Sequence, residues 1–142
     1  MSLLLDTNVV SELRKDDRRI DPAVAAWART QDLAAHWLSC ITVMELAIGI
    51  RRKAARDPEQ GRVLGAWLDN SVLTSFRTRI LPIDLRVALA AADLHARQPR
   101  PERDALIAAT AIVHGLAVAT RNVVHFEPLG VRVVNPWQPH QP

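Results

Sequence analysis

Three carboxylates stand close to places where apolar runs of the sequence give way to polar residues. Asp6 follows the first apolar run, Glu45 comes shortly after the second, and Asp104 stands near the start of a late helical pattern. A fourth polar group, Thr120-Arg121-Asn122, follows another apolar run. In open parallel sheets, ligands bind beyond the carboxyl ends of the strands. Polar groups at these four places are therefore the first candidates for a functional site.

Carboxylates gathered in this way could hold a hard divalent cation. Mg²⁺ prefers oxygen ligands in octahedral geometry, usually one or two carboxylates completed by water and substrate phosphate. Asp6, Glu45 and Asp104 could provide such a set. A bound metal would lower the pKa of a coordinated water and would neutralise charge as a phosphodiester passes through its in-line transition state. The three acids therefore indicate metal-assisted hydrolysis of phosphodiesters.

Each acid also has a structural explanation when it is taken singly. Asp6 could cap a helix, and Thr42-Val43-Met44-Glu45 fits the capping box, in which Glu reaches back to the first backbone amide. Asp104 lies in a first helical turn, where the helix dipole stabilises any acid by a few tenths to about 1 kcal/mol. Three unrelated strand ends, however, have no structural reason each to offer an acid beside Thr or Asn. Together, the acids favour a functional site.

The elements that must position these acids alternate between strands and helices. Short apolar runs predict strands at residues 2–5, 36–41, 79–83, 116–120 and 131–134. Helical spacing and the residues that start or stop helices predict helices at residues 6–15, 21–31, 42–56, 63–76, 84–95 and 102–114. This alternation predicts an α/β fold with a central, mainly parallel sheet that is covered by helices on both faces.

Length and composition suit one domain, residues 1–142, with a short proline-rich tail from about residue 135. The chain has 142 residues, 49% of them hydrophobic, which is enough for one core. Cys40 is the only cysteine, which excludes an intramolecular disulfide framework and a cysteine-rich zinc site. No segment approaches the roughly 20 apolar residues of a membrane helix, and the opening apolar run is too short for a signal peptide. We therefore expect a cytoplasmic protein.

The basic residues favour nucleic acid only weakly. The formal net charge is +3, and all but two of the 18 basic residues are arginine, whose planar fork suits phosphate. Two basic runs follow acid-bearing segments: Arg14, Lys15, Arg18 and Arg19, and then Arg51, Arg52, Lys53 and Arg56. Either run could guide an RNA backbone toward a metal, but cations are also common at ordinary helix ends. Both interpretations stay open.

Four segments occur in an order and at separations that are typical of one family. They are Leu4 to Glu12 (LLDTNVVSE), Thr42 to Gly49 (TVMELAIG), Asp104 to Ala111 (DALIAATA) and Ala119 to Asn122 (ATRN), and Asn135-Pro136-Trp137 follows near the end. Together they resemble the PIN-domain ribonucleases of the VapC and FitB type, over essentially the whole chain. Each segment alone is a weak motif, whereas four in order are specific.

The resemblance implies a three-layer α/β/α PIN-like domain that cleaves single-stranded or loop RNA with Mg²⁺, for which Mn²⁺ could substitute. It implies that Asp6 and Asp104 contact the metal most directly, while Glu45 binds it through water or acts as general base. Thr7, Asn8 and Thr120 match positions that usually support the acids or touch substrate. An interpretation as turn and cap residues is about equally good for these three.

One position departs from the family pattern. Many PIN domains have a fourth acid after the last catalytic strand, where this sequence has Asn122, with His125 three residues later. An asparagine can offer a carbonyl oxygen to a metal or hold a water, but it adds no negative charge. We therefore expect one tightly bound Mg²⁺. His125 is taken as a packed surface residue and not as part of the catalytic set.

The resemblance also implies partners. FitB-like toxins generally form homodimers and are held inactive by a small, DNA-binding antitoxin, which often inserts a basic side chain among the acids. The expected partners of this chain are therefore an RNA substrate, a cognate antitoxin and a second copy of the chain. We expect no membrane partner.

Three other classes of protein compete with this interpretation. A phosphatase of the haloacid dehalogenase kind also begins with a strand and an acid, but it needs a second Asp where Asn8 stands. A catalytically silent PIN-fold module could bind RNA or protein without cutting. A DNA-binding module is disfavoured because no helix-turn-helix or zinc pattern appears and a carboxylate cluster repels phosphate unless metal intervenes.

Overall fold

Short strands alternate with helices along residues 1–138, the part of the chain that the computed structural model describes. The end of the predicted proline-rich tail, residues 139–142, lies outside the described residues. The strands are β1 (Leu3–Leu5), β2 (Leu38–Ser39), β3 (Ile80–Leu81), β4 (Ala117–Ala119) and β5 (Val133–Val134). The helices are α1 (Thr7–Leu13), α2 (Pro22–Arg29), α3 (Cys40–Arg56), α4 (Pro58–Trp67), α5 (Leu73–Ser75), α6 (Leu85–Arg97), α7 (Glu102–His114) and α8 (Val123–Phe126).

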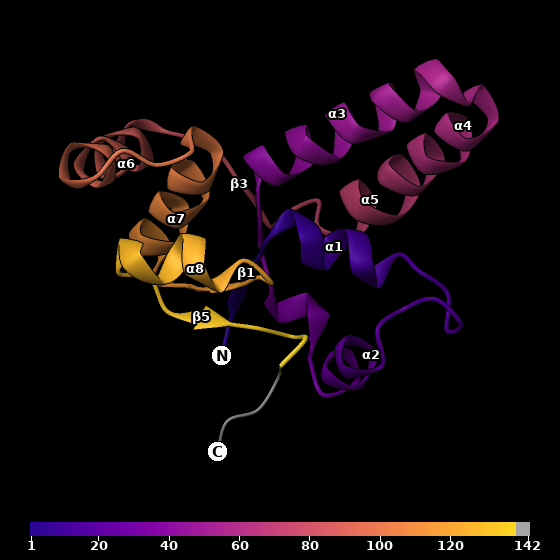
Figure 1. Ribbon diagram of the computed structural model, residues 1–142, viewed down its shortest axis with the longest axis horizontal. Helices are drawn as coiled ribbons and strands as arrows, with labels where there is room; N and C mark the ends of the chain where they lie inside the picture. Colours follow the sequence, from indigo (N-terminus) through magenta and orange to yellow (C-terminus); the bar gives the residue numbers. More distant parts are fainter. Residues whose placement is uncertain (139–142) are drawn as a thin grey trace.

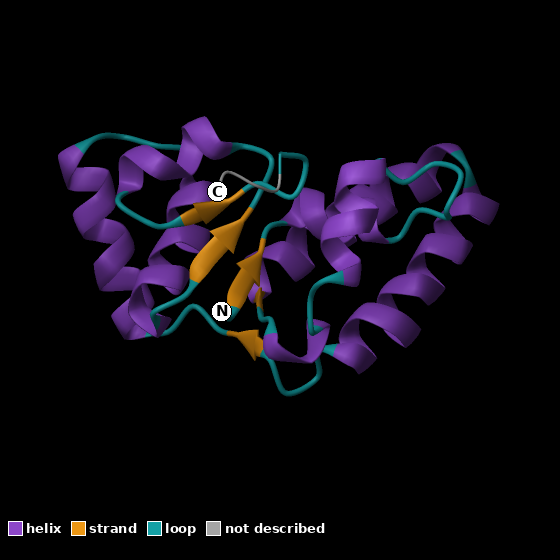
Figure 2. Cartoon of the chain, turned by 90° about the horizontal axis from the view of Figure 1, so that it is seen from below, coloured by secondary structure: helices purple, strands orange, loops and turns teal. Residues whose placement is uncertain are grey.

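The strands pair in parallel, as the sequence predicted. β1 pairs with β4, and β4 pairs with β5. β2 pairs with β3, and a parallel bridge between Leu4 and Trp37 ties this pair to β1. The backbone N–H of Leu5 donates to the carbonyl of Trp37 at 2.9 Å across that junction. The strands therefore lie in the order β3, β2, β1, β4, β5, and Figure 2 shows them side by side with helices around them.

The sheet has a separate apolar core on each face. Side chains alternate between faces along a strand, so Leu4 and Val118 point into one core while Leu3 and Leu5 point into the other. The first core is closed by apolar side chains of α6, α7 and α8, and the second by those of α1, α2 and the region after α4. This arrangement confirms the expected α/β fold with a helical layer on both faces.

Local signals explain where several helices begin and where α7 ends. Asp6, Asp21, Asp57 and Asp84 each accept a hydrogen bond from a backbone N–H in the first turn of the helix that follows. Such a cap stabilises a helix by about 1 kcal/mol. Gly115 ends α7 with φ +68°, a left-handed conformation that glycine adopts without strain.

Two sequence predictions placed element boundaries wrongly. The predicted strand 36–41 is shorter, because the Ser39 side chain accepts from the N–H of Ile41 and α3 begins at Cys40. Thr42 is therefore a buried residue within the helix, and the capping-box explanation of Glu45 is wrong. The helix predicted at 63–76 begins earlier, at Pro58, and passes through a π-helical turn, η2 (Leu68–Val72), before α5. Helix α8 was not predicted.

The α3 and α4 helices form an antiparallel pair that extends away from the sheet (Figure 1). The close approach of the two helices occurs at Gly61, where a Cβ would lie 2.3 Å from the Cβ of Ala54. Within residues 1–138, none of the helices has the length and apolar content needed to cross a lipid bilayer.

Candidate functional site

Asp6 and Thr120 lie next to each other because they end adjacent parallel strands. Leu5 is opposite Ala119 in the β1–β4 register, so the next residue of each strand emerges at the same edge of the sheet. The Thr120 hydroxyl donates to Asp6 Oδ2 at 2.7 Å. The N–H of Thr7 donates to Asp6 Oδ1 at 2.8 Å. Both carboxylate oxygens of this buried acid are therefore held in fixed directions.

Glu45 reaches the same edge from α3. The Thr7 hydroxyl donates to Glu45 Oε1 at 2.6 Å, so one threonine supports two acids: its amide holds Asp6 and its side chain holds Glu45. The Thr42 hydroxyl lies 3.4 Å from that of Thr7 and comes from the first turns of α3. The structure thus brings together residues that are 38 positions apart in the sequence.

Asp104 comes from the first turn of α7, and two basic side chains flank it and Glu45. His125 Nδ1 of α8 lies 3.4 Å from Asp104 Oδ2, and Arg103 Nη1 lies 3.7 Å from Glu45 Oε2. Sequence reasoning left His125 out of the site and did not consider Arg103. His125 was noticed three residues after Asn122, but nothing in the sequence indicated its contact with Asp104, and nothing singled out Arg103.

The pKa values of Asp6 and Asp104 are raised, chiefly by burial and in smaller part by neighbouring acids. Burial raises the pKa of Asp6 above its ordinary value, the hydrogen bonds from Thr120 and Thr7 lower it, and the charges of Glu45 and Asp104 raise it. Burial also raises the pKa of Asp104, against the lowering effect of His125, and the charge of Glu45 raises it further. A cation placed among these groups would relieve this repulsion.

The donor chemistry fits a hard divalent cation. The acids offer carboxylate oxygens, the ligands that Mg²⁺ prefers. Within residues 1–138, no three acidic, cysteine or histidine side chains converge closely enough to enclose an ion. Mg²⁺ usually keeps several waters and takes only one or two carboxylates from the protein, so it does not need such a cage. The donor types of Asp6, Glu45 and Asp104 are therefore those that suit this ion.

Asn8 and Asn122 connect the turn after β4 to the start of α1. Asn8 Nδ2 lies 3.5 Å from the Thr120 hydroxyl, and the N–H of Arg121 donates to Asn8 Oδ1 at 3.3 Å. The N–H of Asn122 donates to the Thr120 hydroxyl at 3.0 Å. Asn122 takes part through its backbone, and the residue is exposed. These contacts hold Thr120 where it meets Asp6.

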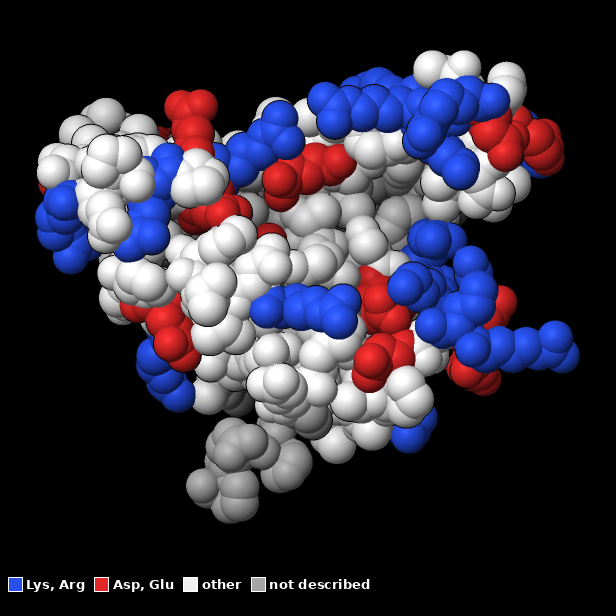
Figure 3. Space-filling model, viewed as in Figure 1, with Lys and Arg blue, Asp and Glu red and all other residues white. Residues whose placement is uncertain are grey.

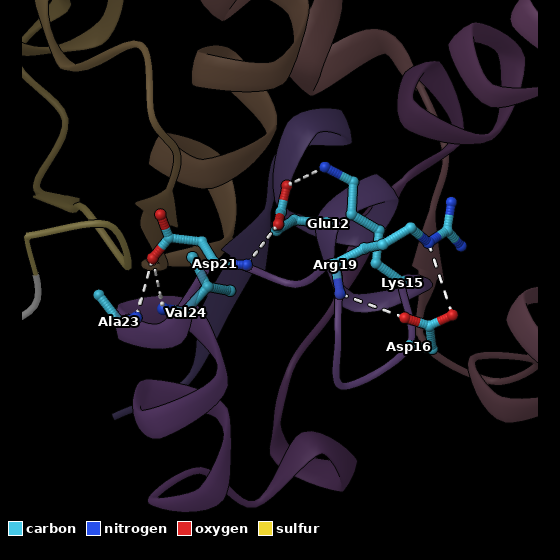
Figure 4. A network of polar contacts seen from close by, with 7 residues as sticks. All are labelled: Glu12, Lys15, Asp16, Arg19, Asp21, Ala23 and Val24. Atoms are coloured by element: carbon cyan, nitrogen blue, oxygen red, sulfur yellow. Dashed lines mark hydrogen bonds and ion pairs between the residues drawn. The ribbon is translucent and has the colours of Figure 1, made fainter.

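The basic run after α1 is held in place by one buried acid. Glu12 is only 8% exposed; Oε1 accepts from Lys15 at 2.9 Å and Oε2 accepts from the N–H of Asp21 at 2.8 Å (Figure 4). The contact with Lys15, followed by that with the Asp21 amide, lowers the pKa of Glu12. Asp16 accepts from the N–H of Arg19 within the loop. Sequence reasoning did not identify Glu12.

The basic side chains gather on two parts of the surface. Figure 3 shows Lys and Arg along the α3–α4 pair and around the loop that follows α1. On α3, Arg51, Arg52 and Arg56 are exposed. Arg18 and Arg19 are exposed on the loop, where Glu12 anchors the chain. Each predicted basic run thus contributes exposed arginines to the surface.

Comparison with known proteins agrees with this geometry. The model of the PIN domain family matches residues 3–127. The chain is 39% identical to VapC ribonuclease Y4jK of Sinorhizobium fredii over 142 residues, which covers 96% of this chain and 99% of that protein. The family match over residues 3–127 includes all three acids.

Solved structures agree on the fold. The structure superposes on the crystal structure of FitAcB from Neisseria gonorrhoeae with a TM-score of 0.85 and 37% identity, covering 96% of this chain and 99% of that one. A toxin–antitoxin complex from Klebsiella pneumoniae gives a TM-score of 0.63 at 29% identity, covering 94% and 97%. With its parallel sheet, its two helical layers and its acids at the carboxyl ends of the strands, the chain belongs to the PIN-domain family.

Proposed function

We propose that this chain is a Mg²⁺-dependent endoribonuclease that acts as the toxin of a toxin–antitoxin pair. The observation that carries the proposal is the hydrogen-bonded arrangement at the carboxyl end of β1: Thr120 and Thr7 fix the carboxylate of Asp6, and the Thr7 hydroxyl holds Glu45 beside it. Asp104 stands in the first turn of α7, within reach of His125. A relative that spans nearly the whole chain is a VapC ribonuclease. The chemistry of the acids and the name of the relative agree on phosphodiester hydrolysis.

The proposed roles of the three acids are those that the resemblance to PIN-domain ribonucleases implies. Asp6 and Asp104 would hold the ion, and Glu45 would bind it through water or act as general base. A bound Mg²⁺ supplies a Lewis acid and a water of lowered pKa. Thr120 and Thr7 fix the two oxygens of Asp6, each of which keeps a lone pair for a further partner. The Thr7 hydroxyl directs the carboxylate of Glu45.

The proposed partners follow from the same relatives. A nuclease that degrades the RNA of its own cell must be neutralised, and one solved structure that resembles this chain is a toxin–antitoxin complex. We infer a cognate antitoxin, with the DNA-binding part, and a homodimer of this chain, as in FitB-like proteins. Co-expression with the neighbouring reading frame, followed by purification and mass measurement of the complex, tests both partners.

The test of the nuclease is cleavage of a mixed RNA pool by purified, antitoxin-free protein. Cleavage is measured with Mg²⁺, with Mn²⁺ and with EDTA, for the natural chain and for Asp6→Asn and Asp104→Asn. Asp93→Asn, which changes an exposed acid of α6, is the matched control. We expect cleavage to require metal. Each site substitution should reduce cleavage by more than the roughly 10- to 100-fold loss that is typical when a residue supporting a metal ligand is changed.

Two outcomes would contradict the proposal. Cleavage that continues in EDTA or in the Asp6→Asn and Asp104→Asn variants would place the activity elsewhere. RNA binding without any cleavage, with either metal, would support the alternative of a catalytically silent PIN-fold module.

A further inference from the structure

Arg103 is a cation that the chain itself places beside the acids. It stands in the first turn of α7, one residue before Asp104, and its Nη1 lies 3.7 Å from Glu45 Oε2. The other oxygen of Glu45 accepts from Thr7 at 2.6 Å. Glu45 therefore has one firmly bound oxygen and one oxygen that faces a guanidinium.

The contact between Arg103 and Glu45 is weak enough to be exchanged. Direct hydrogen bonds between a guanidinium and a carboxylate are about 2.7–2.9 Å long, well below the 3.7 Å seen here. The Arg103 side chain is 48% exposed and that of Glu45 is 24% exposed. Ion pairs in such surroundings contribute little because water screens them and two long side chains must be ordered. A divalent cation at Glu45 would displace the guanidinium at small cost.

Arg103 also has the chemistry for the substrate of such a site. A guanidinium carries five donors in a planar fork that matches phosphate oxygens in two-point contacts. Two other arginines near the strand ends and α1 are engaged with aromatic rings: Arg121 lies 5.1 Å from the Trp137 ring centroid and Arg14 lies 5.9 Å from that of Trp67. Arg103, in contrast, faces the carboxylate of Glu45.

We propose that Arg103 binds the RNA phosphate next to the acids, and that Glu45 holds its guanidinium until a divalent cation takes that carboxylate. The inference rests on the proposed nuclease function and adds a substrate-binding residue to it. Cation binding then has two effects on RNA: it neutralises the acids, which repel phosphate, and it frees a side chain that attracts it. RNA binding and metal binding are thereby coupled through one residue.

The test is binding of a labelled single-stranded RNA, measured by fluorescence anisotropy in Ca²⁺ and in EDTA over a series of salt concentrations. A gel confirms that the RNA stays intact in Ca²⁺. Arg103→Gln removes the charge and the fork, and Arg103→Lys keeps the charge alone. Arg29→Gln is the matched control, since Arg29 is exposed at the end of α2 and the chain then runs to the start of β2, away from the acids.

We expect the natural protein to bind RNA more tightly in Ca²⁺ than in EDTA. In Ca²⁺, Arg103→Gln lowers the affinity about 10-fold, the size expected for a lost charged hydrogen bond. It also reduces the slope of log K against log salt concentration by about 0.7, the value for one phosphate contact on a single strand. Arg103→Lys keeps the slope but binds more weakly than the natural protein, and Arg29→Gln changes neither quantity.

A calorimetric titration with Ca²⁺ alone gives a second readout, free of RNA and of turnover. Arg103→Gln binds Ca²⁺ more tightly because the competing cation is gone. If Arg103→Gln retains the natural RNA affinity and salt slope while the natural protein binds RNA, Arg103 is a surface ion-pair partner and only this inference is wrong. If the natural protein binds no RNA in Ca²⁺, the proposed nuclease function fails with it. Equal melting temperatures exclude a folding defect.

Discussion

At the scale of single residues, hydrogen bonds stabilise the ionised form of Asp6 against the cost of its burial. Asp6 is 5% exposed, and it would be costly to ionise there without the donors Thr120 and Thr7. Those donors lower its pKa, but burial and the charges of Glu45 and Asp104 leave it raised. The ionised form is therefore less stable in the folded chain than in the unfolded one. Such a cost is expected where a cation is bound.

Asp6→Asn should stabilise the metal-free protein at neutral pH. Because the pKa of Asp6 is raised on folding, the folded state binds more protons than the unfolded state between the two pKa values, so stability falls as pH rises through the folded pKa. The amide has no charge to bury and can pair with both Thr7 and Thr120. We expect a higher Tm than that of the natural protein at pH 7.5 in EDTA.

The advantage should shrink as pH falls toward 3.8, the ordinary pKa of this carboxyl group. The measurement is thermal unfolding, monitored by circular dichroism at pH 7.5 and near pH 3.8. Asp93→Asn is the control for an exposed acid. A lower Tm for Asp6→Asn at pH 7.5 would mean that the hydrogen bonds of the carboxylate outweigh its burial.

At the scale of elements, the α3–α4 pair depends on one close contact. α3 carries Glu45 near its start and three exposed arginines toward its end. α4 packs against it at Gly61, where an added Cβ would meet Ala54 Cβ at 2.3 Å and Ala54 Cα at 2.6 Å. The backbone of α3 cannot yield as a flexible side chain would. The glycine is needed for close packing, and its conformation is ordinary helix.

Gly61→Ala and Gly65→Ala should therefore have opposite effects, although both glycines lie within α4. A Cβ at Gly65 meets nothing within 4 Å, so alanine there gains helix propensity of up to about 1 kcal/mol. The same gain at Gly61 is outweighed by overpacking, which costs about 1–3 kcal/mol. The free energy of unfolding in urea, measured for both variants, is the test. Equal stabilisation by both would mean that the helices separate without cost.

At the scale of the whole molecule, stability depends on joining the two parts of the sheet. β2 and β3 meet β1 through the bridge at Trp37, and the preceding residue, His36, is buried below them. The N–H of Leu3 donates to His36 Nδ1 at 3.1 Å, and Nε2 lies 2.9 Å from Gln31 Oε1. Since Nδ1 accepts, the ring is neutral and Nε2 carries the proton. Burial lowers the pKa of His36.

The folded protein should lose stability as pH falls through 6.5, the ordinary pKa of histidine. The unfolded chain takes up a proton there while the folded chain does not, so stability is full above pH 6.5 and falls until the lowered pKa of the folded state is reached. One proton limits the slope to about 1.4 kcal/mol per pH unit. His36→Asn keeps an acceptor for Leu3 and removes the titration.

Urea unfolding at pH 7.5 and pH 5.5 measures this effect as the difference between the natural protein and His36→Asn. Contributions from other titrating groups are common to both and cancel. If the two proteins lose the same amount of stability between these pH values, the pH dependence comes from groups other than His36.

Much of the fold could be predicted from the sequence because its signals are local. Helix α7 ends where Gly115 requires a left-handed turn, and α6 begins where Asp84 caps it. The order of strands and helices follows from the spacing of apolar residues, which a short window contains. The acids Asp6 and Asp104 were identifiable for the same reason, since each belongs to a short motif in a recognisable family.

The contacts of those acids depend on tertiary packing. The contact of Thr7 with Glu45 spans 38 positions, and that of Thr120 with Asp6 spans 114. Neither the approach of Arg103 to Glu45 nor that of His125 to Asp104 has a signature in a short window, because each depends on how α7, α3 and α8 pack around the end of the sheet. The amino-acid sequence specifies which chemical groups are available. Which of them meet depends on packing, because the two cores together set the distances between segments that are far apart in the chain.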